Sequence, residues 1–121
     1  MTAKTVLLVE DDLELRDILQ DILEADGYDV VPACDGRQAL RYLMLSGEPM
    51  PDVMVLDLMM PMVNGWQVLD AIRSEAGLER LPVIVISASN RGRPEGATTY
   101  LQKPFSLAQL IESIHEHHES S

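Results

Sequence analysis

Basic residues are scarce in this chain of 121 residues, and so are cysteine and long hydrophobic runs. Lys and Arg together number 9 against 20 Asp and Glu, so the formal net charge is −11. An acidic chain repels the phosphates of nucleic acids and the headgroups of anionic membranes. Direct binding to nucleic acid is therefore disfavoured, and binding to an anionic membrane surface is disfavoured for the same reason.

The shortage of cysteine and of apolar runs limits the location of the protein. Cys34 is the single cysteine and has no partner for a disulfide within the chain. No apolar run approaches the roughly 18 residues that cross a bilayer, and acidic residues follow the N-terminus too closely for a secretory signal peptide. We expect a cytoplasmic protein without membrane insertion, built as one domain over residues 1–121 with no effector domain.

Short apolar runs alternate with stretches that have helical spacing. Strands are expected at 5–9, 28–33, 53–57, 82–87 and 99–102, and helices around 15–23, 39–44, 68–72 and 107–114. The expected strands are apolar throughout, which is typical of a parallel sheet with helices on both faces. The pattern predicts an α/β fold with an open, doubly wound sheet.

Polar residues follow the ends of four expected strands. Glu10 and Asp11 follow the first strand, Asp57 ends the third, Ser87 ends the fourth and Lys103 follows the fifth. In an open parallel sheet, the ligand site lies outside the carboxyl ends of the strands. The chain has only two lysines, so one of them directly after a buried strand is a candidate for function. The sequence therefore predicts a site at this edge of the sheet.

This set of residues suits phosphoryl transfer to a carboxylate. Clustered carboxylates repel one another unless a hard cation lies among them, and Mg²⁺ prefers one or two carboxylates together with water and phosphate oxygens. Asp57 is the candidate nucleophile, which would form an aspartyl phosphate. Lys103 would supply positive charge, and Ser87 would donate its hydroxyl to a phosphoryl oxygen.

Four segments together resemble the receiver domain of response regulators in two-component signalling. They are LLVEDD at 7–12, VLDLMMPMVNG at 55–65, the Ser87-Ala88 pair and YLQKPF at 100–105. The resemblance covers nearly the whole chain and implies a flavodoxin-like, five-stranded parallel sheet with strand order 2-1-3-4-5. It also implies that Asp57 receives a phosphoryl group from a phosphohistidine on a sensor histidine kinase or a phosphotransfer protein.

The resemblance further implies a metal site. Asp11 and Asp57 would bind Mg²⁺ together with the backbone carbonyl of Met59, and Glu10 would act largely through water. No other cofactor is implied.

Two further features follow from the same resemblance. Ser87 and Tyr100 look like a switch pair, in which the hydroxyl moves toward the phosphoryl group and the aromatic ring turns inward. The Lys103-Pro104 bond lies where the family carries a cis peptide. Such a protein is no enzyme in the usual sense, because it catalyses only its own phosphorylation and dephosphorylation.

One segment departs from the family pattern. Lys103 follows Ser87 by 16 positions, fewer than receivers usually show, and the segment between them contains Gly92, Pro94 and Gly96 but no apolar stripe. We therefore expect the helix between the fourth and fifth strands to be absent or reduced to one turn. We also expect the segment to be mobile, and the face that carries output to an unknown downstream protein to be altered.

Other functions remain open at this point. The main alternative is a receiver-like interaction module that works without phosphorylation. A phosphatase or ATPase with an aspartyl phosphate is disfavoured, because Met59 lies where such enzymes carry a second aspartate. A flavodoxin-like cofactor binder is disfavoured, because the acids at 10–12 would repel a phosphate.

Several residues have simpler interpretations. Asp12 is expected to cap the first helix in any case. The methionines at 59, 60 and 62 are expected to pack against the sheet. The histidines at 115, 117 and 118 are expected to be a solvated helix end and not a metal site.

Overall fold

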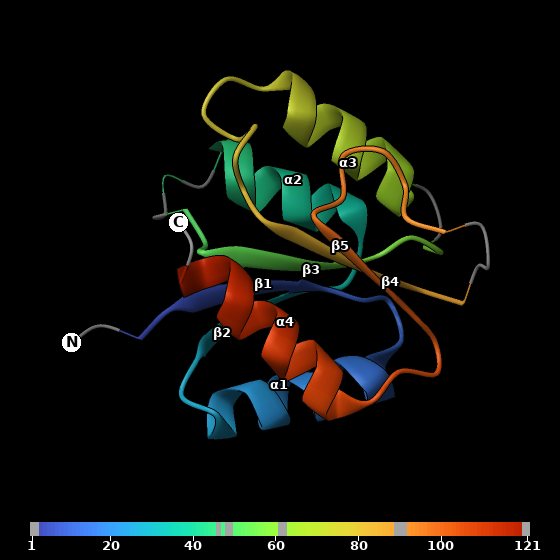
Figure 1. Ribbon diagram of the computed structural model, residues 1–121. Helices are drawn as coiled ribbons and strands as arrows, with labels where there is room; N and C mark the ends of the chain where they lie inside the picture. The colour runs from blue at the N-terminus through green and yellow to red at the C-terminus, as the bar shows by residue number, and fades with distance from the viewer. Residues whose placement is uncertain (1–2, 46, 48–49, 61–62, 89–91, 120–121) are drawn as a thin grey trace.

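A parallel five-stranded sheet forms the middle layer of the computed structural model (Figure 1). The structure describes residues 3–45, 47, 50–60, 63–88 and 92–119. Its elements, in chain order, are β1 Thr5–Val9, α1 Leu13–Ala25, β2 Asp29–Ala33, α2 Gly36–Leu45, β3 Val53–Asp57, α3 Gly65–Ser74, β4 Val83–Ser87, β5 Thr99–Gln102 and α4 Leu107–Glu119. The strand order is β2-β1-β3-β4-β5, with every pair parallel, as the resemblance implied.

The helices cover the two faces of the sheet in pairs. Figure 1 shows α2 and α3 on one face and α1 and α4 on the other. Each pair buries a separate cluster of apolar side chains against the strands. All five residues of β3 and of β4 are buried, because these central strands are covered on both sides. This burial explains the continuous apolar runs in the sequence.

Side chains at the helix starts satisfy backbone N–H groups that have no partner within the helix. The Asp12 carboxylate accepts a bond from the first turn of α1, as the sequence predicted. Asn64 and Gln67 form a reciprocal capping box at α3. Ser106 and Gln109 exchange the same pair of bonds at α4. These caps fix where each helix begins, and so they fix the loops at the carboxyl ends of the strands.

The connection between β4 and β5 contains no helix in its described residues, 88 and 92–98. A parallel crossover usually includes a helix that covers the sheet. The prediction that this helix is absent or strongly shortened is therefore confirmed for the described part of the chain. Arg93 in this connection is exposed, and Arg91 lies outside the described residues.

Arg73 on α3 holds this connection in place. Its Nε donates to the carbonyl oxygen of Gly96 at 2.8 Å, and its Nη1 donates to those of Leu78 and Glu79, each at 3.1 Å. Partial burial lowers the pKa of Arg73, and no carboxylate of a described residue pairs with it. The segment that we expected to be mobile passes beside α3 in its described part (Figure 1), and Arg73 bonds Gly96 to that helix.

Replacing Arg73 by Met is expected to lower the free energy of unfolding by about 2 kcal/mol, because three backbone carbonyls lose a charged donor. Amide hydrogen exchange should accelerate over residues 92–98. Arg37→Met is the control, since Arg37 is exposed on α2. Equal exchange rates over 92–98 in both variants would show that Arg73 does not hold the segment.

Two of the simpler interpretations need correction. The Met59 side chain is 58% exposed and does not pack against the sheet, whereas Met60 is buried there; Met62 lies outside the described residues. His115 Nε2 lies 3.1 Å from an Asp26 oxygen, and His117 Nε2 lies 2.6 Å from Thr99 Oγ1. The described histidines are therefore bonded to neighbouring elements and are not simply solvated, and the side chain of His118 lies outside the described residues.

Candidate functional site

The predicted site residues meet at the carboxyl edge of the sheet. Because β1, β3, β4 and β5 are neighbours and run in parallel, their ends lie side by side. Backbone bonds continue past the strands, from Leu58 N–H to Ile86 O at 3.2 Å and from Lys103 N–H to Ser87 O at 2.7 Å. This pairing brings residues distant in the sequence to one edge.

Lys103 lies between two buried carboxylates. Its Nζ is 3.2 Å from Glu10 Oε1 and 3.5 Å from Asp57 Oδ2. Glu10 is 0% exposed and Asp57 is 2% exposed, so both charges depend on nearby partners. The ammonium of Lys103 is closer to Glu10 than to Asp57, which the sequence did not predict. The Lys103-Pro104 peptide bond is cis, as the resemblance implied.

Three carboxylates form a group that fits a divalent cation. Oxygen atoms of Glu10, Asp11 and Asp57 all lie within 4.8 Å of one another. Three carboxylates face one ammonium, so the group carries excess negative charge. Hard oxygen donors with excess negative charge are what Mg²⁺ binds in proteins. The residues present therefore fit the ion that the resemblance implies.

The crowding of these carboxylates changes their proton affinities. Burial raises the pKa of Glu10, and a hydrogen bond and charge repulsion from Asp57 raise it further. Partial desolvation and a hydrogen bond with Glu10 raise the pKa of Asp11. Burial opposes the charge of Lys103, but attraction to Asp57 and Glu10 outweighs it, so the pKa of Lys103 is raised. The lysine therefore remains charged at neutral pH.

The raised pKa of Glu10 predicts a dependence of stability on pH. The folded protein holds this proton more tightly than the unfolded chain, so the resulting stabilisation is present below the ordinary pKa of 4.5 and is lost as pH rises through the higher native value. In EDTA, Glu10→Gln should therefore gain stability relative to the wild type between pH 4.5 and pH 7. Urea unfolding at the two pH values measures this, and a constant difference would contradict it.

Asp57 is held from its own loop as well. Its Oδ1 accepts a bond from the Met59 N–H at 3.1 Å, so the backbone of Met59 lies beside the carboxylate. The N–H of Gly65, where α3 begins, bonds to the Leu58 carbonyl at 3.0 Å. A Cβ atom at Gly65 would lie 2.7 Å from the Asp57 carbonyl oxygen, so only glycine fits here.

Ser87 and Tyr100, the predicted switch pair, lie on neighbouring strands. Ser87 ends β4 and is fully buried. Tyr100 on β5 is half-buried and packs against the cluster under α2 and α3. The register pairs Tyr100 with Val85, two residues before Ser87. The two side chains are therefore near in the sheet, but the structure does not place the ring at the acid group.

Arg16 is a site residue that the sequence analysis missed. Its Nη1 donates to the Glu10 carbonyl oxygen at 2.8 Å, and the N–H of Asp12 donates to Glu10 Oε2 at 3.2 Å. These bonds position the loop that carries the acids. Its position in the first turn of α1, four residues after the last of the three acids at 10–12, is the signal that could have indicated Arg16.

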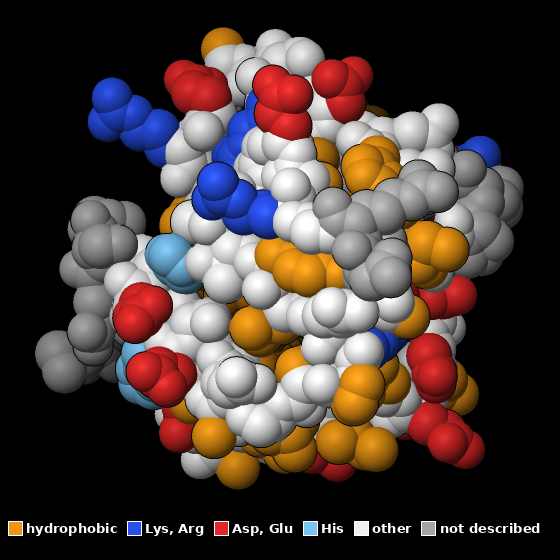
Figure 2. Space-filling view, turned by 45° about the vertical axis from the view of Figure 1, so that its right-hand side comes forward, with side chains coloured by type: hydrophobic (Ala, Val, Ile, Leu, Met, Phe, Trp, Pro, Cys, Tyr) orange, Lys and Arg blue, Asp and Glu red, His pale blue; other side chains and the backbone are white. Residues whose placement is uncertain are grey.

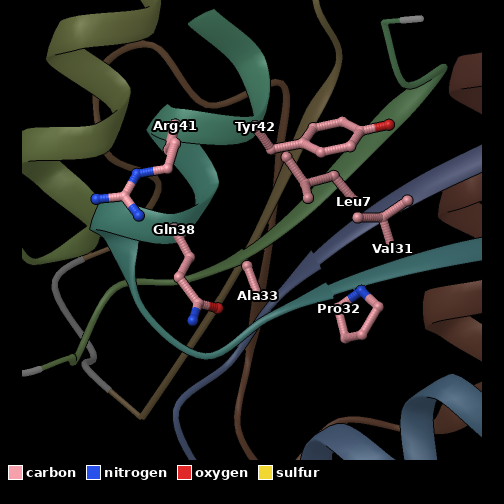
Figure 3. A pocket seen from close by; sticks show the side chains of 7 residues that line it. All are labelled: Leu7, Val31, Pro32, Ala33, Gln38, Arg41 and Tyr42. Carbon is pink, nitrogen blue, oxygen red and sulfur yellow. The ribbon is translucent and has the colours of Figure 1, made fainter. Parts of the chain in front are cut away.

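The cavity between β2 and α2 contributes nothing to this site. It has a volume of about 250 Å³, and its lining residues are Leu7, Val31, Pro32, Ala33, Gln38, Arg41 and Tyr42 (Figure 3). No carboxylate lines it. The candidate site at the strand ends therefore lies apart from this cavity.

A match to known proteins decides the family. The family model described as response regulator receiver domain matches residues 6–115. The chain belongs to this family. The transcriptional regulatory protein CpxR of Escherichia coli is 38% identical over 115 residues, which cover 90% of this chain and 47% of CpxR. The receiver therefore spans about half the length of the curated relatives it matches.

Solved receiver structures agree with the fold. The receiver domain of the Francisella response regulator 1452 has a TM-score of 0.85 and 32% identity, over 97% of this chain and 98% of that one. The receiver domain of the sensor histidine kinase PA1611 from Pseudomonas aeruginosa has a TM-score of 0.88 and 27% identity, over 98% and 99%. That structure has a magnesium ion coordinated in the active-site cleft. No described helix of the present receiver is long and apolar enough to cross a membrane.

Proposed function

We propose that this receiver accepts a phosphoryl group on Asp57 in a Mg²⁺-dependent reaction and thereby switches its contacts with other proteins. The observation that supports this most directly is the position of Asp57, a buried carboxylate at the end of β3 with Lys103 Nζ at 3.5 Å. We also propose that residues 1–121 form one receiver domain.

The transfer step is a displacement at phosphorus. An Asp57 carboxylate oxygen forms a P–O bond while the P–N bond of a phosphohistidine breaks, and the departing imidazole takes up a proton. The product is an acyl phosphate. Lys103, which already lies between Glu10 and Asp57, pairs with the added negative charge.

Glu10, Asp11 and Asp57 would hold Mg²⁺, with the backbone of Met59 as a further ligand. Bound there, the ion neutralises charge on the phosphoryl oxygens. Glu10 stays bonded to Asp12 N–H and Lys103, which suits the expected contact through water. Arg16 fixes the loop around these acids through the Glu10 carbonyl.

Ser87 and Tyr100 are the proposed switch pair. The Ser87 hydroxyl is buried at the end of β4, and it would move toward the phosphoryl group on Asp57. The half-buried Tyr100 ring would then turn inward. If the Ser87 and Tyr100 side chains have two alternative arrangements, phosphorylation can favour one of them and so change the conformation of the output surface.

The proposed donor is a sensor histidine kinase or a phosphotransfer protein in the cytoplasm. We propose that the downstream partner is another protein, because a net charge of −11 opposes direct contact with nucleic acid. The connection between β4 and β5 lacks a helix in its described residues. The output surface therefore differs from that of a receiver with a helix there.

That altered connection is also the observation that favours the second candidate, an interaction module that works without phosphorylation. The intact set of Asp57, Ser87 and Lys103 favours the phosphoacceptor, since a module of this kind has no use for all of them.

Binding of beryllofluoride, a phosphoryl mimic, tests the proposal. With Mg²⁺ and beryllofluoride, the amide NMR signals of Asp57, Ser87 and Lys103 should shift, and Asp57→Asn should abolish the shifts. Asp52→Asn is the control, because Asp52 lies at the opposite end of β3. Shifts that persist in Asp57→Asn, or none in the wild type, would favour the second candidate.

A further inference from the structure

A cleft lies beside α3, between that helix and the described part of the connection between β4 and β5. The cleft has a volume of about 510 Å³, roughly twice that of the cavity in Figure 3. Its lining residues are Trp66, Leu69, Asp70, Arg73, Glu95 and Gly96. One wall is therefore α3, and the other consists of Glu95 and Gly96 in the connection between β4 and β5. A volume of about 300 to 1,000 Å³ is typical of ligand sites.

Hydrogen bonds hold the two walls in a fixed relation. Arg73 extends from α3 to the Gly96 carbonyl at 2.8 Å. Gly96 has a φ of +94°, and a Cβ there would come within 3.3 Å of Arg73 Cγ, so glycine permits this close approach. Arg73 uses its Nε and Nη1 donors on carbonyls within the chain, so these groups hold the walls together and are not free for a ligand. Because these bonds already hold the walls in place, less conformational entropy is lost when a ligand binds.

The remaining side chains of the cleft are of the kinds that bind an Arg or Lys side chain, which has a charged end group on an apolar chain. Trp66 is 37% exposed on one turn of α3, and Leu69 forms a buried floor. Asp70 lies one helical turn after Trp66, and Glu95 lines the cleft from the other wall. Both acids are exposed, and neither forms an ion pair with another described residue. An aromatic ring beside two carboxylates attracts an Arg or Lys side chain.

We propose that this cleft is a docking site for a basic amphipathic helix of a partner protein. An Arg or Lys side chain of the partner lies against the Trp66 ring and pairs with Asp70 and Glu95, while an apolar side chain contacts Leu69. The partner helix thus lies between α3 and the described residues of the connection between β4 and β5. This docking goes beyond the proposed phosphorylation and does not require a phosphoryl group on Asp57.

A second copy of this chain does not suit the cleft. Its net charge is −11, although the face in Figure 2 shows Lys and Arg side chains as well as acidic ones around an area of exposed hydrophobic side chains. Two copies with this net charge repel each other. Complementary charge therefore favours a basic partner.

Trp66 makes the docking directly measurable, because it is the only tryptophan in the chain. The probe is a helical peptide of alanine, leucine and arginine, with leucine and arginine spaced to share one face. Titration of the peptide should change the fluorescence of Trp66 and shift the amide NMR signals of α3 and residues 92–98. A peptide with glutamate in place of arginine should cause neither change.

Matched variants separate docking from general attraction to an acidic protein. The double variant Asp70→Asn/Glu95→Gln should weaken binding about tenfold, because both carboxylates of the cleft are lost. The control Asp21→Asn/Glu112→Gln changes net charge equally on exposed positions of α1 and α4, and should weaken binding less than about twofold. Unfolding midpoints verify that both variants fold.

Equal weakening in the two double variants would overturn the proposal, and so would peptide-induced shifts confined to α1 or α4. Absence of any binding by the arginine peptide would overturn it too. The same titration in Asp57→Asn should give the wild-type affinity. Failure of phosphorylation and failure of docking are therefore distinguishable.

Discussion

Lys103→Met is expected to lower the rate of phosphorylation of Asp57 by acetyl phosphate by about a hundredfold, a loss typical of removing one charged donor from a transition state. The structure gives the reason, since Lys103 Nζ lies 3.5 Å from Asp57 Oδ2 and is the cation nearest the carboxylate among the described residues. The rate is measured by the gain in mass over time at fixed Mg²⁺.

Lys4→Met is the matched control, because Lys4 is the only other lysine and pairs with Asp52 at the opposite end of the sheet. It should phosphorylate at the wild-type rate. A Lys103→Met variant that remained folded and reacted as fast as Lys4→Met would remove Lys103 from the proposed reaction.

Gly65→Ala is expected to destabilise the protein by about 3 kcal/mol, at the upper end of overpacking costs. The new Cβ would lie 2.6 Å from Leu58 Cα and 2.7 Å from the Asp57 carbonyl oxygen, and backbone atoms cannot rotate away. Relief of the clash must move the backbone of Asp57, so phosphorylation should slow as well. Urea unfolding and the mass assay measure the two effects.

Gly77→Ala is the control for the loss of a glycine. Gly77 has a φ of 92°, but a Cβ there meets nothing within 4 Å. Its cost should be about 1 kcal/mol, which is backbone strain alone. Equal destabilisation by the two substitutions would show that α3 can shift away from β3 without cost.

The sheet and most helices were predictable because their signals are local. Buried strands appear as continuous apolar runs, and caps such as Asp12 and Asn64 lie next to the helices they start. The absence of a helix from the described residues between β4 and β5 was predictable for the same reason, since the segment with Gly92, Pro94 and Gly96 lacks a helical pattern. The strand order could be predicted only from the resemblance to receiver domains, because apolar runs in a sequence do not indicate which strands are neighbours in the sheet.

Contacts between distant residues were not predictable. Arg73 bonds to Gly96 across 23 positions, and nothing in the composition of a Gly-rich and Pro-rich segment indicates that α3 holds it. The position of Lys103 nearer Glu10 than Asp57 also depends on side-chain geometry. Met59 follows an apolar strand, yet its side chain turns outward while its backbone contacts Asp57.

Intact-mass spectrometry after incubation with acetyl phosphate tests the central claim most directly. The wild type should gain the mass of one phosphoryl group in Mg²⁺ and almost none in EDTA, and Asp57→Asn should gain none in either condition. The P–O bond of acetyl phosphate breaks, and acetate leaves as the Asp57 acyl phosphate forms. A folded wild type that gains no mass in Mg²⁺, or an Asp57→Asn variant that gains as much, would contradict the account.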